Sequence, residues 1–274
     1  MISERWLVIL AYIIMIISNV ISSTSNLYNH TNNTKISEEN PTTITPDGIT
    51  FAVWGPIYLF QLGLLSRQFW EKGTIFNAKM RLTIVVAFIA NAVWLPIFAY
   101  QYWWLSLTII ITYLAALTEI YSIQMNINYA DSRPWRTKVW AYTPISLNLA
   151  WITIATLLNI TIVFRNSNII VTKTQQQIIG GNTDWAVNAV VIATAIAIYK
   201  IFNATDIIYG LTTAWALLGI YRNQKEQQRI WAEICAIAII TLSIIQMAVV
   251  CIKRKTKLHT KLHTNLLQQS EQIA

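Results

Sequence analysis

The chain has 274 residues, of which 55% are hydrophobic and only 12% are charged. An ordinary soluble domain has about twice that fraction of charged residues, so this composition excludes a typical soluble domain and predicts a helical integral membrane protein. The formal net charge is +8, but Lys and Arg are spread among the segments between apolar runs and no nucleic-acid-binding motif accompanies them. Membrane lipid, not nucleic acid, is therefore the expected partner.

Eight apolar runs predict an all-α protein with eight transmembrane helices. They cover residues 6–21, 49–65, 82–100, 102–121, 140–164, 185–202, 207–221 and 230–252. The first run is short, and Ser22 and Ser23 after it leave a cleaved signal peptide as an alternative to a retained helix. Almost no loop separates the third run from the fourth, which predicts a tight hairpin with Trp103 and Trp104 at the membrane interface.

The distribution of Lys and Arg predicts the orientation. With the N-terminus inside, the inner segments and the tail hold fourteen basic residues and the outer segments hold six. This excess satisfies the positive-inside rule and predicts that both termini are cytoplasmic. The polar loop at residues 22–47 then faces outward with two glycosylation sequons, at Asn29 and Asn32.

Few residues suggest redox, metal or proton chemistry. Cys235 and Cys251 lie sixteen residues apart in the last run. That separation is roughly 24 Å along a helix, too far for a disulfide, so buried thiols are expected. His259 and His263 could hold a metal on a helix, but a basic, membrane-adjacent tail is the preferred interpretation and no metal site is predicted.

Charged residues inside or beside the apolar runs have a structural explanation in most cases. Asp184 and Asp206 lie at helix starts, where an acid is favoured by the helix dipole. Glu119 lies near the inner end of the fourth run and is expected to reach the interface, with a proton-relay role as the alternative. No pair or cluster suited to catalysis is visible, so the chain is not expected to be an enzyme.

Three sequence blocks resemble the TspO/MBR family, the tryptophan-rich sensory or translocator proteins. They are TPDGITFAVWGPIYL at residues 45–59, NAVWLPIFAY at residues 91–100 and LAWITIATLLN at residues 149–159. Their order and spacing resemble those of the family over residues 6–164, which supports a retained first helix. The resemblance implies a bundle of five helices with a pocket for porphyrins, haem or other hydrophobic ligands.

This chain also departs from that five-helix pattern. Three more helices follow, so the expected organisation is a TspO/MBR-like bundle at 1–164, a polar loop at 165–183, three additional helices at 184–252 and a basic cytoplasmic tail at 253–274. The longer layout resembles the tryptophan-rich sensory group of the family. Ile160 stands where the family has its cholesterol-recognition Tyr, so the resemblance does not predict sterol binding at that point.

Aromatic and amide side chains at helical spacing form the candidate ligand site. On the third span Asn91, Trp94 and Phe98 share one helical face. On the fifth span Asn148 and Trp151 repeat the three-residue offset of Asn91 and Trp94. The predicted ligand-binding residues are Trp54, Tyr58, Asn91, Trp94, Phe98, Asn148, Trp151 and Asn159. Indole rings can stack on a flat conjugated ligand and amides can reach its polar edge. The alternative is that these residues only pack one helix on another.

The expected function is therefore binding, transporting or sensing a hydrophobic small molecule such as a porphyrin, haem or sterol. No cofactor is required, with porphyrin or haem considered as a ligand, and a homodimer is left open. Two other functions are considered: a secondary transporter of a small solute that depends on Glu119 or Asp206, and a scaffold that binds no ligand.

Overall fold

The computed structural model describes residues 4–24, 33–69, 76–130, 135–166, 183–224 and 227–273. Within these ranges the regular structure is helical and no strand occurs. The elements are α1 (Glu4–Thr24), α2 (Asn33–Glu39), the 3-10 helix η1 (Gly48–Val53), α3 (Trp54–Arg67), α4 (Ala78–Ala99), α5 (Trp103–Ala130), α6 (Trp135–Asn166), α8 (Thr183–Ala204), α9 (Ile207–Asn223) and α10 (Gln227–Ile273). The predicted all-α membrane architecture is confirmed.

Each of the eight predicted spans corresponds to a helix. Seven helical segments among the described residues are long and apolar enough to cross a membrane. The eighth, α9, has 17 residues and begins at Ile207, where the sequence predicts it. At 1.5 Å per residue α9 is about 26 Å long, slightly less than the ~30 Å hydrocarbon core of a bilayer. The chain is thus a multi-pass integral membrane protein.

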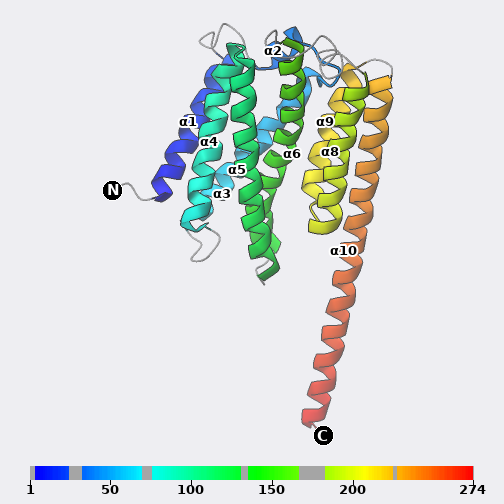
Figure 1. The fold of residues 1–274 in the computed structure, drawn as a ribbon. Coiled ribbons are helices and arrows are strands. Elements are labelled where there is room, and N and C mark those ends of the chain that lie inside the picture. The colour runs from blue at the N-terminus through cyan, green and yellow to red at the C-terminus, as the bar shows by residue number, and fades with distance from the viewer. Residues whose placement is uncertain are drawn as a thin grey trace.

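The helices form one bundle in which α6 and α9 join two groups (Figure 1). In the first group α1 packs on α4, α4 on α5 and α5 on α6, while α3 lies against α6. In the second group α9 packs against α6 and is flanked by α8 and α10. The N-terminus and the protruding end of α10 lie on one side of the bundle, and α2 lies at the other end.

Capping residues and tight turns explain several helix boundaries. Asn77 caps α4 by accepting a hydrogen bond from the Met80 amide at 2.7 Å. The predicted α4–α5 hairpin is confirmed, and Gln101 makes its turn with a left-handed φ of 61°. Asp206 caps α9 by accepting from the Tyr209 amide at 3.0 Å, as predicted for an acid at a helix start.

Asp206 also connects the two helix groups. Its second carboxylate oxygen accepts a hydrogen bond of 2.7 Å from the Ser146 hydroxyl of α6. The Tyr209 hydroxyl of α9 and the Thr153 hydroxyl of α6 lie 3.0 Å apart. In a medium without water, these bonds satisfy polar groups that would otherwise destabilise the α6–α9 interface.

The structure differs from the sequence expectations in three places. The polar loop at residues 22–47 contains the short helix α2, and the 3-10 helix η1 precedes α3. The tail at residues 253–274 continues α10 as a helix to Ile273. Cys235 is buried as expected, but Cys251, also on α10, is exposed. The sequon asparagines, Asn29 and Asn32, lie outside the described residues.

Candidate functional site

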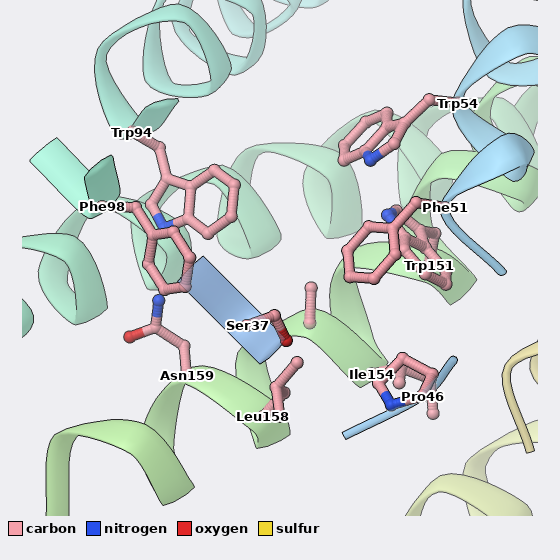
Figure 2. Close-up of a pocket in the computed structure, with 11 residues that line it drawn as sticks. Ser37, Pro46, Phe51, Trp54, Trp94, Phe98, Trp151, Ile154, Leu158 and Asn159 are labelled. Atoms are coloured by element: carbon pink, nitrogen blue, oxygen red, sulfur yellow. The ribbon is translucent and has the colours of Figure 1, made fainter. Parts of the chain in front are cut away.

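A narrow slot lies between η1, α3, α4 and α6 (Figure 2). Its lining residues are Ser37, Pro46, Phe51, Trp54, Trp94, Phe98, Trp151, Ile154, Ala155, Leu158 and Asn159. Ser37 from α2 and Pro46 from the following loop close it at the end of the bundle where α2 lies. The slot is therefore built from segments that are far apart in the chain.

Aromatic rings form two facing walls of the slot. Figure 2 shows Trp94 and Phe98 on one side, and Phe51, Trp54 and Trp151 on the other. The Trp94 and Phe98 rings are stacked, with centroids 4.8 Å apart. On the opposite wall, the Trp151 ring lies edge-to-face with Trp54 at 6.1 Å and with Phe51 at 5.6 Å. Each wall is thus held by ring–ring contacts of ordinary favourable geometry.

Helical periodicity explains why α6 contributes so many lining residues. Trp151, Ile154, Ala155, Leu158 and Asn159 are spaced i, i+3, i+4, i+7 and i+8, which places them along one face of the helix. Trp94 and Phe98 of α4 are likewise four residues apart on a single face. The register of the two helices therefore determines which side chains meet.

The free space in the slot is narrow. About 500 Å³ is free of atoms, but only about 30 Å³ admits the centre of a water molecule. A single water needs about 10–15 Å³ by this measure, so the slot has room for small molecules only in this arrangement. A larger flat ligand requires its walls to separate.

Three polar atoms of the lining residues have no hydrogen-bond partner among the described residues. They are Trp94 Nε1, a donor, Asn159 Oδ1, an acceptor, and the Ser37 hydroxyl, which can do either. The Asn159 Nδ2 group donates to the Ser106 hydroxyl of α5 at 2.7 Å, which fixes the amide in place. Because an unpaired buried polar group is costly, these three atoms are candidates for contact with a ligand or a water molecule.

A second, wider cavity lies on the other side of Phe51 and Trp54. It has about 390 Å³ of room for the centre of a water molecule. Its lining residues are Ile16, Asn19, Val20, Ser22, Ser23, Phe51, Trp54, Gly55, Tyr58 and Leu95. Phe51 and Trp54 line both cavities, so they form the partition between them. The Trp54 ring stacks on Tyr58 at 5.4 Å on the side of the second cavity.

Asn91 and Asn148 belong to a buried polar network instead. The Asn148 amide exchanges contacts of 2.7 and 3.0 Å with the Tyr113 hydroxyl of α5. Asn91 accepts a hydrogen bond of 2.7 Å from Asn19 of α1, and Asn19 in turn accepts one from the Tyr58 hydroxyl. For Asn91 and Asn148, the structure therefore places the amides where they join helices, in agreement with the packing alternative.

The predicted site residues thus fall into three places. The slot brings together Trp54, Trp94, Phe98, Trp151 and Asn159. Tyr58 lines the second cavity, and Asn91 and Asn148 line neither. The spacing of Phe51 and Trp54 could have shown that both lie on one helical face. Ser37 and Pro46 lie in a segment whose fold the sequence pattern did not predict.

Other chemistry has little support among the described residues. No group of three or more His, Cys, Asp or Glu residues is close enough there to hold a metal ion. Glu119 lies 2.5 Å from the Lys79 amine, with 42% of its side chain exposed. Asp206 already accepts two hydrogen bonds, one from the Tyr209 amide that it caps and one from the Ser146 hydroxyl of α6.

Comparison with known proteins gives one match. The family described as TSPO-like protein matches residues 5–252, which include all eight spans. No curated protein and no solved structure matches the chain.

Proposed function

Because the chain belongs to the TSPO-like family, we propose that it binds a flat hydrophobic ligand of the porphyrin class in the slot between α3, α4 and α6. The observation that carries the proposal is the convergence of three Trp side chains from three helices on one narrow space: Trp54, Trp94 and Trp151. Such a space suits a conjugated ring system, which can stack on indole faces while its edge contacts the few polar groups.

The polar atoms of the slot support the same ligand class. Trp94 Nε1 can donate to a carboxylate of the ligand, and Asn159 Oδ1 can accept from a ring N–H. Both groups are buried, so pairing them with a ligand removes a desolvation penalty that the ligand-free slot carries. Haem is a further candidate of this class, and the proposal concerns ligand binding, not catalysis.

The ligand has to displace part of the partition. Drug-sized ligands occupy pockets of about 300–1,000 Å³, whereas only about 30 Å³ of the slot admits the centre of a water molecule. Trp54 separates the slot from the second cavity, which adds about 390 Å³. A rotation of Trp54 would join the two spaces, so the bound state is expected to differ from this structure at that side chain.

Titration with protoporphyrin tests the proposal. Purified protein in detergent should bind the porphyrin and shift its absorption band, which is measured on the ligand and does not depend on the number of Trp residues. Replacing Trp94 or Trp151 by Ala should raise Kd about tenfold, since loss of one stacking contact of about 1.4 kcal/mol corresponds to that factor. Trp6→Ala is the matched control, because Trp6 is 58% exposed on α1.

The result that would reject the proposal is equal affinity in the wild type and in a variant that lacks Trp54, Trp94 and Trp151. A secondary transporter remains the alternative class. Solute uptake that requires Glu119 or Asp206 and is indifferent to the three Trp residues would support it.

A further inference from the structure

The segment that closes the slot is attached to α9, in the second helix group. We call residues 42–47 the lid segment, since Pro46 within it lines the slot and the chain continues into η1 and Phe51. Thr42 and Thr45 hydrogen bond to each other within the segment, which gives it a compact turn. Apart from the bonds that Thr50 of the adjoining η1 donates to Asp47, the hydrogen bonds among the described residues that tie the lid segment to another helix run to the C-terminal end of α9.

Main-chain carbonyls of the lid segment are held by amide side chains. Gln224 Nε2 donates to the Thr45 carbonyl at 2.8 Å and to the Thr42 carbonyl at 3.1 Å. Asn223 Nδ2 donates to the Thr45 carbonyl at 3.0 Å. The Asp47 amide donates in the other direction, to the Gly219 carbonyl at 3.1 Å. These bonds determine the position of the lid segment independently of any ion pair.

An ion pair completes the attachment. Arg222 Nε lies 2.8 Å from Asp47 Oδ2, and Arg222 Nη2 lies 3.3 Å from Asp47 Oδ1, so the guanidinium engages both carboxylate oxygens. Burial alone would raise the pKa of Asp47, but hydrogen bonds from Thr50 and Arg222 outweigh it and lower the pKa, so the carboxylate is charged at neutral pH. The Arg222 side chain is 41% exposed and that of Asp47 is 24% exposed, so water and salt reach the pair.

Close packing continues this contact below the lid segment. The Trp215 indole N–H of α9 donates to the Thr50 carbonyl of η1 at 2.9 Å. Gly219 approaches Thr50 so closely that a Cβ atom there would clash with the Thr50 side chain. The position of the start of η1 is therefore also determined by its contacts with α9.

We propose that the C-terminal end of α9 is a latch for the slot, with Arg222 and Gln224 as positioning residues that hold the lid segment closed. Opening the latch admits molecules to the slot from the end of the bundle where α2 lies. The inference about ligand exchange rests on the proposed function, whereas the inference about access to the slot does not. It gives the last three helices a role in how fast the slot exchanges its contents.

Access to the slot can be measured without any ligand. Cys235 and Cys251 are replaced by Ala, and Ala155, which lines the slot, is replaced by Cys. The rate at which a neutral, water-soluble thiol reagent modifies this cysteine is followed by mass spectrometry. Arg222→Gln and Gln224→Ala should each raise the rate about fivefold, the factor expected when an opening equilibrium loses one hydrogen-bonded contact.

Matched variants separate the latch from a general loss of stability. Arg81→Gln breaks the Arg81–Glu4 ion pair, whose atoms lie 3.3 Å apart where α1 and α4 begin, and should leave the labelling rate unchanged. Exchanging the charges, with Asp47→Arg and Arg222→Asp together, should restore part of the slow rate that each single change loses. In the protein with Arg222 intact, raising NaCl from about 0.05 M to about 1 M should speed labelling because the ion pair is screened.

Porphyrin exchange then tests the consequence for the ligand. Association and dissociation rates should both rise in Arg222→Gln while Kd changes by less than about threefold, since the latch changes the route and not the contacts in the slot. An unchanged labelling rate in both Arg222→Gln and Gln224→Ala overturns the latch, whatever the porphyrin does. Faster labelling in a protein that binds no porphyrin keeps the latch and rejects the proposed function.

Discussion

At the scale of single residues, the Tyr113 hydroxyl is the centre of the polar network inside the first helix group. Asn148 pairs with it directly, and Asn91 and Gln61 also face it from α4 and α3. Asn91 Nδ2 and Gln61 Oε1 have no partner within hydrogen-bond geometry among the described residues. Tyr113 thereby connects α3, α4, α5 and α6 at one level of the bundle.

Removing this hydroxyl should destabilise the protein. Tyr113→Phe keeps the ring but leaves the buried Asn148 amide without its partner, at a cost of about 1–2 kcal/mol. Thermal unfolding in detergent should show a Tm several degrees lower, and porphyrin affinity should change little because Tyr113 does not line the slot. Thr108→Val, which removes an exposed hydroxyl on the same helix, is the control. Equal Tm values for the two variants would contradict a stabilising network.

At the scale of helices, the contact between η1 and α9 depends on a residue without a side chain. Gly219→Ala places a methyl group against Thr50 and forces one of the two segments to move. Such overpacking costs about 1–3 kcal/mol, so Tm should fall, and the cysteine placed at residue 155 should be labelled faster because η1 and the lid segment are displaced.

Gly55→Ala is the control for that change. A Cβ at Gly55 meets no atom within 4 Å, and Ala has the higher helix propensity, so this variant should keep or slightly raise Tm. Faster labelling in Gly55→Ala as well would mean that opening does not depend on the η1–α9 contact. An unchanged Gly219→Ala protein would mean that the close approach is relieved without moving the lid segment.

The same scale explains how much could be predicted from the sequence. The apolar runs predicted the helices, because each span must satisfy its backbone hydrogen bonds in lipid. The spacing of Trp94 and Phe98 predicted that the two rings share one helical face, which is one wall of the slot. Asn148 and Asn159 lie on one face of α6 by their spacing, but roughly 16 Å apart along its axis, so they meet different parts of α5. Ser37 is positioned by contacts of α2 with α4 and η1, and Pro46 lies in the lid segment that α9 holds. No local pattern encodes either set of contacts.

At the scale of the whole molecule, the last three helices are part of one family unit with the first five. The TSPO-like match covers residues 5–252 without a break between α6 and α8. Hydrogen bonds at Asp206 and at the lid segment join α9 to the first group at the two ends of the bundle. The division at residues 164 and 184, and assembly as a homodimer, stay predictions, as does the cytoplasmic position of the termini.

The protruding end of α10 should be dispensable for the bundle. The helix runs to Ile273, and Figure 1 shows its last part extending beyond the other helices. With 47 residues α10 is about 70 Å long, more than twice the hydrocarbon thickness, so its end lies outside the membrane. A chain that ends at residue 255 should keep its Tm within about 2 °C and its porphyrin affinity, since the part removed extends beyond the other helices.

A truncation that removes more of α10 provides the comparison. A chain that ends at residue 238 also loses Ile239 and Ser243, which are fully buried in the contact of α10 with the bundle. Its Tm should fall by several degrees, because about 1.5–3 kcal/mol is lost for each large apolar side chain removed from a buried site. Since α10 supports α9 and α9 holds the lid segment, the labelling rate in the slot should rise only in this shorter chain. A rise in the chain that ends at residue 255 would show that the protruding helix itself acts on the latch.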